Sequence, residues 1–214
     1  MSKKVYVVLS QTTTFVAKSI RSITGCKYNH AAICFDTEFK EIYAYARKQH
    51  HAFFSAGLVH ESRVRYLEKN CELPVAVYEL EITDEQYNWI RCVIAYMMNN
   101  KEYKYNLFSM LSYPILKGVK TYKAFTCSEF VAFILRKLGY LTLKESYEYV
   151  PEDIGKELTE YLWFEGDMRE LVKEIDTDET YYGHYSRKWL YKDVTSLARL
   201  CERAFMSMSF FSFF

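Results

Sequence analysis

The sequence predicts an α+β fold, and three observations lead to it. Half of the 214 residues are hydrophobic, while only 7 are Gly and 3 are Pro, so disordered and collagen-like chains are excluded. Several short segments alternate with a period of two residues, which predicts strands. Two capping boxes, each followed by apolar residues at helical spacing, predict helices. A chain of this length buries roughly 70% of its unfolded surface, which is enough for a core without metal or disulfide.

Four strands are expected, at residues 5–10, 29–35, 41–46 and 75–82. The second and third form a hairpin around a polar turn at 36–38. In that hairpin His30 lies on the same face as Ala32 and Cys34, and it looks across at Glu41 or Tyr43 on the partner strand. The residues between the third and fourth strands are expected to be rich in loops, with a further strand near 64–67.

Helices are expected where a capping residue precedes an apolar stripe. The expected helices are residues 13–24, residues 84–100 after the Thr83 capping box, residues 103–116 with Pro114 as their end, a short helix from Pro151, and residues 186–206. In the second of these, the inward stripe is expected to be Trp89, Cys92, Val93 and Tyr96. Residues 163–168 have the composition of a tight hairpin.

The most informative helix begins after Thr126. Thr126 and Glu129 have the spacing of a capping box, and Gly139 is a suitable stop. The apolar positions between them recur at helical spacing and comprise Cys127, Phe130, Val131, Ile134, Leu135 and Leu138. Cys127 is therefore expected in the first turn of a core helix.

Charge and cysteine content exclude several function classes. Lys and Arg number 28 against 27 Asp and Glu, so no basic field favours nucleic acid as a partner. The N-terminal apolar run is too short for a signal peptide, which predicts a cytoplasmic protein with reduced thiols. The six cysteines contain no CxxC pair, and Cys26, His30 and Cys34 lack a fourth ligand nearby, so neither a metal nor a cofactor is expected.

Cys127 and His30 are the residues best suited to chemistry. The positive end of a helix and a neighbouring imidazole both stabilise a thiolate, which is the nucleophilic form of cysteine. Cys127 is expected at the positive end of a helix. His30 is the candidate for the neighbouring imidazole, because it is the only histidine on an expected strand with an acidic or phenolic partner, Glu41 or Tyr43. Taken alone, a cysteine on an inward helix face is more often a packing residue.

Two blocks in a particular order strengthen the catalytic interpretation. Tyr28-Asn29-His30-Ala31-Ala32-Ile33 and Phe125-Thr126-Cys127-Ser128-Glu129-Phe130-Val131 resemble the His strand and the Cys helix start of circularly permuted NlpC-type papain-like cysteine hydrolases, the YiiX and YycO-like group. The order, His before Cys, is that of the permuted group. Pro151-Glu152-Asp153 and Ser10-Gln11-Thr12 resemble further segments of the group, and the resemblance covers roughly residues 4–155.

The resemblance implies a papain-like antiparallel sheet or partial barrel packed against helices, with a catalytic domain at 1–160 and a C-terminal hairpin and helical extension at 161–214. It implies that Cys127 attacks a carbonyl, that His30 transfers the proton, and that a strand residue orients the imidazole. Alignment with the strand of the group places Tyr43 at the position of the orienting residue. Glu41, two residues earlier, is favoured by its chemistry, because a carboxylate stabilises an imidazolium better. The backbone N–H of Cys127 is the expected oxyanion donor. Further oxyanion or substrate-binding residues are expected among Ser10, Gln11, Tyr28 and Ser128.

The leading functional prediction is a cysteine hydrolase that cleaves an amide bond through a thioester, on a small peptide or acyl-amino acid substrate. The alternatives are a lipid-directed acyl hydrolase or acyltransferase, because the permuted group includes relatives of lecithin:retinol acyltransferase, and a non-catalytic binding module. The Phe-rich tail, residues 205–214, is expected to pack on the fold or on a second copy, or to make a weak membrane contact.

Overall fold

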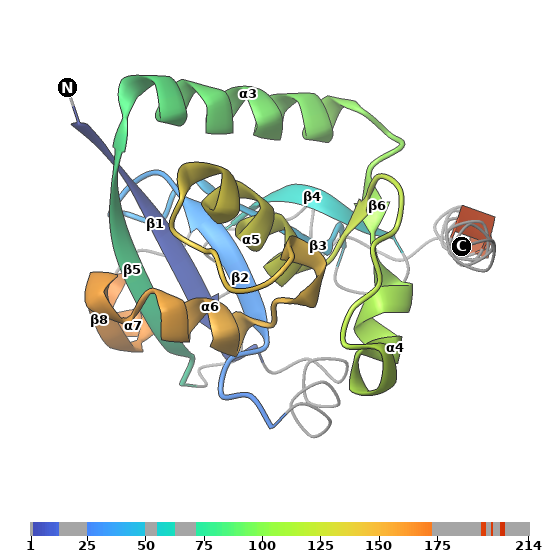
Figure 1. Ribbon diagram of the computed structural model, residues 1–214. Helices are drawn as coiled ribbons and strands as arrows, with labels where there is room; N and C mark the ends of the chain where they lie inside the picture. Colours follow the sequence, from blue (N-terminus) through green and yellow to red (C-terminus); the bar gives the residue numbers. More distant parts are fainter. Residues whose placement is uncertain are drawn as a thin grey trace.

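A six-stranded antiparallel sheet forms the centre of the molecule (Figure 1). The computed structural model describes residues 2–12, 25–49, 55–62 and 72–172, together with 194, 195, 198, 202 and 203. The strand order is β4-β3-β2-β1-β5-β8, so the sheet is open, with β4 and β8 at its edges. The strands are β1 (Ser2–Ser10), β2 (His30–Cys34), β3 (Ile42–Arg47), β4 (Ala56–Glu61), β5 (Pro74–Thr83) and β8 (Leu162–Asp167).

Five α-helices have described bounds. They are α3 (Asp84–Asn99), α4 (Leu107–Leu116), α5 (Cys127–Leu138), α6 (Pro151–Glu157) and α7 (Met168–Leu171), with short 3₁₀ turns η2 (Ser146–Glu148) and η3 (Thr159–Tyr161). A two-stranded parallel pair, β6 (Lys104–Tyr105) and β7 (Ala124–Phe125), joins the start of α4 to the start of α5. The fold is therefore α+β, as the sequence predicts.

The sheet has a buried core on each face. On one face, alternate residues of β1 such as Val5, Val7 and Leu9 pack in a core that includes α3 and α5, both of which lie over the sheet in Figure 1. On the other face, the intervening residues Tyr6 and Val8 pack in a core that includes α7. Because both faces are covered there, residues 5–10 of β1 and residues 75–78 of β5 are buried without a break, whereas residues 79–83 of β5 alternate between buried and more exposed positions.

Four expected strands are confirmed, while β4, β8 and the short strands β6 and β7 were not predicted. β1, β2, β3 and β5 match the expected segments within a few residues. β4 lies in the stretch expected to be rich in loops. The expected hairpin at 163–168 was wrong, because these residues form strand β8, which pairs with β5 and leads into α7. Residues 162–171 therefore belong to the same sheet and core as the preceding chain.

The expected inward stripe of α3 was half right. Trp89 and Val93 pack, partly buried, against the core, whereas Cys92 is exposed and Tyr96 is 59% exposed. The fully buried residues are Ile90, Ile94 and Met97, while the tyrosine ring, with its polar hydroxyl, faces outward. The Thr83–Gln86 capping box is confirmed in both of its hydrogen bonds.

Pro114 lies inside α4 rather than at its end. Proline removes one helical N–H, and the helix continues for only two more residues before Lys117 adopts the left-handed conformation that ends it.

The remaining expected elements fall outside the described residues. These are the helix at 13–24, the strand at 64–67 and the tail at 205–214. Within the expected helix 186–206, the five described residues are helical. No helix among those the structure describes has the length and apolar character needed to cross a bilayer.

Candidate active site

Cys127 is the first residue of α5 and is 7% exposed. The hydroxyl of Thr126 accepts the Glu129 backbone N–H, and the Glu129 carboxylate accepts the Thr126 backbone N–H, so the capping box is complete. Gly139 ends the helix with a φ of 85°. The backbone N–H groups of Ala31 and Ser128 lie near the Cys127 sulfur and help to lower its pKa. The thiol thus sits against both the helix N-terminus and strand β2.

His30, at the start of β2, connects Cys127 to a carboxylate. Its Nε2 lies 2.9 Å from Oε2 of Glu61, and its ring lies close enough to the Cys127 thiol for each group to shift the pKa of the other. Because Nε2 faces Glu61, Nδ1 is the nitrogen left for the thiol. All three side chains are largely buried. Cys127, His30 and Glu61 therefore form the nucleophile, base and orienting acid of a triad.

The electrostatics of this triad favour an ion pair. Burial lowers the pKa of His30, but the charge of Glu61 and the bond to Cys127 outweigh it and raise the pKa to about 10. Burial raises the pKa of Cys127, while the bond to His30, its positive charge and the backbone N–H groups of Ala31 and Ser128 bring it below the ordinary value. A thiolate beside an imidazolium is the expected resting state.

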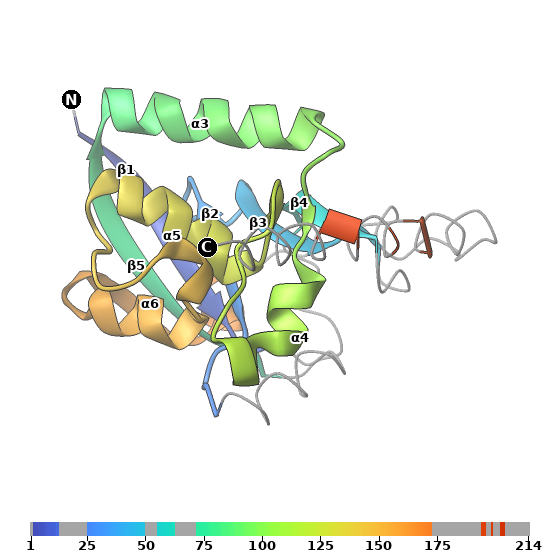
Figure 2. The ribbon, with the colours of Figure 1, turned by 45° about the vertical axis from the view of Figure 1, so that its right-hand side comes forward.

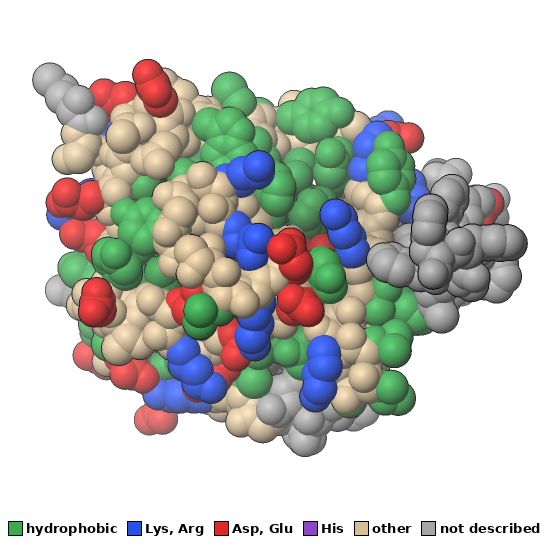
Figure 3. Space-filling model, in the orientation of Figure 1, with side chains coloured by type: hydrophobic (Ala, Val, Ile, Leu, Met, Phe, Trp, Pro, Cys, Tyr) green, Lys and Arg blue, Asp and Glu red, His purple; other side chains and the backbone are tan. Residues whose placement is uncertain are grey.

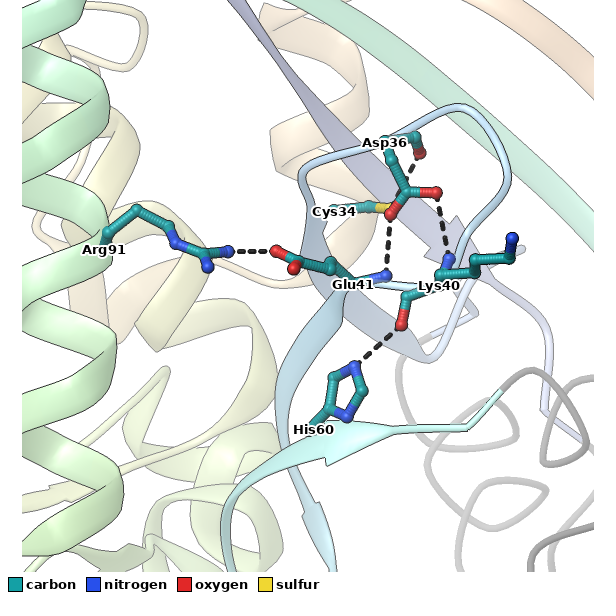
Figure 4. A network of polar contacts seen from close by, with 6 residues as sticks. All are labelled: Cys34, Asp36, Lys40, Glu41, His60 and Arg91. Carbon is teal, nitrogen blue, oxygen red and sulfur yellow. Dashed lines mark hydrogen bonds and ion pairs between the residues drawn. The ribbon is translucent and has the colours of Figure 1, made fainter.

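Glu41 does not reach His30. It forms an ion pair with Arg91 of α3 instead, as Figure 4 shows. Its backbone N–H is also held, at 2.7 Å, by Oδ2 of Asp36, whose carboxylate organises the turn between β2 and β3. Arg91 and Asp36 therefore hold Glu41, while a different carboxylate lies against His30, so the prediction of Glu41 as the orienting acid was wrong.

Tyr43 was the other predicted orienting residue, and it is also placed elsewhere. In the register of β2 and β3 it lies opposite Ile33. Its ring packs edge-on against Phe35 and lies 5.0 Å, centroid to centroid, from the ring of His60. Tyr43 is therefore part of the aromatic packing between β2, β3 and β4.

Glu61 was missed because β4 was missed. It is the last residue of β4, and β4 pairs with β3 rather than with β2, so the acid comes from outside the predicted hairpin. A weak signal exists in the run Ala56-Gly57-Leu58-Val59-His60-Glu61, but Gly57 lowers its strand propensity. Only the tertiary arrangement of the sheet brings Glu61 to His30.

Tyr105 is a further residue of the site that was not predicted to be catalytic. It lies in β6 opposite Phe125 of β7, two residues before Cys127. Its hydroxyl donates to the sulfur of Met110 at 3.5 Å and lies close enough to Cys127 for that thiol to influence its pKa. Burial, followed by the charge of Cys127, raises the pKa of Tyr105 well above its ordinary value. Tyr105 is therefore a protonated donor beside the thiolate.

The predicted oxyanion and substrate-binding residues are only partly brought together. Ser10 pairs with His30 in the β1–β2 register, and its buried hydroxyl has no hydrogen-bond partner in the part of the chain described. Gln11 follows it, with its backbone N–H donated to the Pro74 carbonyl at 2.9 Å. Ser128 supplies a backbone N–H to Cys127, while its hydroxyl lies 3.3 Å from that of Thr126.

Tyr28 serves a different partner. Its hydroxyl donates to Oε1 of Glu165 at 2.8 Å, and Lys27 reaches the same carboxylate oxygen. The structure therefore gives the Tyr28 hydroxyl a structural bond to β8 in place of the predicted contact with substrate.

The other described cysteines and histidine lie apart from the triad. Cys34 donates to the Asp36 carbonyl at 3.1 Å, and burial raises the pKa of its thiol to about 12. Cys92 lies on the exposed side of α3. His60 contacts the Lys40 carbonyl (Figure 4). Among the residues that the structure describes, no group of three His, Cys, Asp or Glu side chains is arranged to hold a metal ion.

Glu129 is a buried carboxyl directly behind the nucleophile. Burial raises its pKa to about 8, against the opposing effects of the Thr126 backbone N–H, the Asn106 side chain and Lys120. At neutral pH this carboxyl is therefore mostly protonated, which keeps a second negative charge away from the thiolate.

Comparisons with protein-family models, with curated proteins and with solved structures find no match to this chain.

Proposed function

We propose that this protein is a cysteine hydrolase that cleaves an amide bond, on a scaffold of the permuted papain-like kind. The observation that carries the proposal is the continuous contact Cys127–His30–Glu61, with a lowered pKa at the thiol and a raised pKa at the imidazole. A structural cysteine in a core has no need of a charged histidine held by a buried carboxylate. The arrangement suits nucleophilic catalysis.

The reaction would proceed in two steps. The Cys127 thiolate adds to the carbonyl carbon, and the tetrahedral intermediate collapses to a thioester as the imidazolium of His30 gives its proton to the leaving amine. Neutral His30 then removes a proton from water, which attacks the thioester and releases the acid and the thiol. Glu61 holds the ring in place and stabilises its positive charge before each transfer.

The oxyanion would be stabilised by donors already near the sulfur. The N-terminus of α5 offers the Cys127 backbone N–H, and the hydroxyl of Tyr105 lies near Cys127 from β6 and could turn toward the oxyanion. Ser10, whose buried hydroxyl lies beside His30 in the sheet, is a candidate for binding the substrate or the attacking water. These donors come from three separate segments that the fold brings to one place.

Trapping of an acyl-enzyme tests the proposal. Incubation with p-nitrophenyl acetate should acylate the wild type once per chain, as seen by intact mass, and hydroxylamine should remove the acyl group as it does from a thioester. Cys127→Ala and His30→Ala should abolish this acylation, whereas Cys92→Ala, on the exposed side of α3, should not. Equal acylation of Cys127→Ala and wild type would reject the proposal.

A lipid-directed acyl hydrolase or acyltransferase is the second candidate. It is favoured by the apolar helix α4, which starts directly after Tyr105 and leaves Leu111 and Ile115 exposed. Parallel panels of acyl-amino acids and lipid esters distinguish the two candidates, since each predicts turnover of one panel and not the other.

A further inference from the structure

Helix α4 has an unusual burial pattern. Eight of its ten residues are apolar or aromatic, yet the only buried residue is Ser109. Ile115 is 84% exposed, Leu111 66% and Leu116 46%. A surface helix normally turns its apolar face to the core and its polar face to water. In α4 the polar Ser109 faces inward, where it accepts the Val119 backbone N–H, and a patch of Leu111, Pro114, Ile115 and Leu116 faces outward.

The chain after this patch is rich in basic residues. From residue 103 to residue 144 there are seven Lys and Arg, and the one acidic residue is Glu129, which is buried. Three of the seven are paired with acids from other segments, namely Lys123 with Glu102, Arg136 with Glu145 and Lys144 with Asp153. Lys117 follows α4 directly and, like Lys120, is exposed. The whole protein carries only +1, so this basic segment is a local feature.

The patch projects from one corner of the molecule. Figures 1 and 2 both place α4 at the opposite end of the fold from α3, and Figure 3 shows hydrophobic side chains along the outer edge of this corner next to a basic one. The Asn106 backbone N–H bonds the Phe125 carbonyl at 2.9 Å, which ties the start of α4 to the segment that leads into Cys127. A surface bound by α4 therefore lies close to the buried thiol.

We propose that α4 and the lysines after it dock this protein onto a bilayer surface that contains anionic lipids. An exposed apolar helix flanked by lysines has the two components of interfacial binding, which are burial of apolar side chains below the headgroups and attraction to negative lipid. A second copy of the chain fits less well, because an interface centred on α4 would bring Lys117 and Lys120 of both copies together. The proposal concerns attachment and holds whether or not Cys127 is a nucleophile.

Vesicle sedimentation of the full chain tests this docking. The wild type should sediment with vesicles of phosphatidylcholine containing about 30% phosphatidylglycerol, more weakly with phosphatidylcholine alone, and less as salt is raised. Leu111→Asp with Ile115→Asp should weaken binding at least about tenfold, and Lys117→Glu with Lys120→Glu should remove the preference for anionic vesicles. The matched control is Leu162→Asp on β8, where Leu162 is 44% exposed, and it should bind as the wild type does.

Three results would overturn the docking proposal. One is wild-type protein that sediments with neither kind of vesicle. Another is binding that survives both α4 variants but is lost when residues 205–214 are deleted, which would assign it to the tail. The third is a concentration-dependent dimer that Leu111→Asp with Ile115→Asp abolishes, without vesicle binding, which would assign the patch to self-association. Circular dichroism of each variant establishes that the fold is retained.

Discussion

Nε2 of His30 lies 2.9 Å from Oε2 of Glu61, and this contact joins the first residue of β2 to the last residue of β4. The two strands are not neighbours, since β3 lies between them. Both side chains are nearly buried, so their attraction is little screened by water. The charge of His30, and with it the ionisation of Cys127, therefore depends on a residue that the β2–β3 hairpin does not contain.

Glu61→Gln should slow acylation of Cys127 about 10- to 100-fold, because the amide keeps a hydrogen bond but removes the charge that stabilises imidazolium. Stopped-flow acylation by p-nitrophenyl acetate measures this effect. Glu41→Gln is the matched control: it makes the same chemical change at the ion pair with Arg91, and the rate should stay within about twofold. An equal loss of acylation rate in the two variants would show that Glu61 does not orient or charge His30.

The imidazole of His30 should titrate at high pH. Its ordinary pKa is 6.5 and its pKa in the fold is raised to about 10, so its favourable pairing is complete below pH 6.5 and is lost as the pH rises toward 10. The ¹³Cε1 resonance of His30 should therefore titrate near pH 10, and at a distinctly lower pH in Glu61→Gln. A wild-type midpoint at the ordinary value would contradict the ion pair.

Tyr105→Phe should reduce kcat about 10- to 100-fold with a smaller change in KM, because the hydroxyl acts on the sulfur and on the developing oxyanion rather than on substrate binding. Steady-state hydrolysis of p-nitrophenyl acetate separates the two constants. Tyr103→Phe, two residues earlier in the sequence, is a suitable control. If the two variants behave alike, Tyr105 is a packing residue.

Glu129→Gln should stabilise the protein at pH 8 and leave it unchanged near pH 4. The folded pKa of about 8 lies above the ordinary 4.5, so the stability present below pH 4.5 is lost as the pH rises to 8. Gln keeps the capping-box hydrogen bond and does not ionise, so the gain at pH 8 should be about 2–3 kcal/mol. Urea unfolding at both pH values measures it, and a gain of the same size at pH 4 would contradict the buried, protonated carboxyl.

Local signals predicted the elements that carry the nucleophile and the base. The Thr126–Glu129 capping box, the spacing of apolar residues up to Gly139 and the alternation around His30 all correspond to what the structure contains. These features could be read because each depends on residues close together in the chain.

Contacts between segments far apart in the chain could not be predicted from local sequence patterns. Glu61 reaches His30 only because β4 pairs with β3, and Tyr105 reaches Cys127 only because β6 pairs with β7. On α3 the sequence predicted Cys92 and Tyr96 to face inward, but packing on the sheet buried Ile90, Ile94 and Met97 instead. In each case the deciding contact lies between segments that no local pattern relates to one another.

The most direct test of the account is the rate at which iodoacetamide alkylates each cysteine at pH 6, followed by peptide mass spectrometry. We expect Cys127 to react faster than Cys92, although Cys127 is nearly buried and Cys92 is exposed, because His30 lowers the pKa of the Cys127 thiol. His30→Ala should remove this advantage. Faster alkylation of Cys92, or an unchanged rate at Cys127 in His30→Ala, would contradict a Cys127–His30 ion pair.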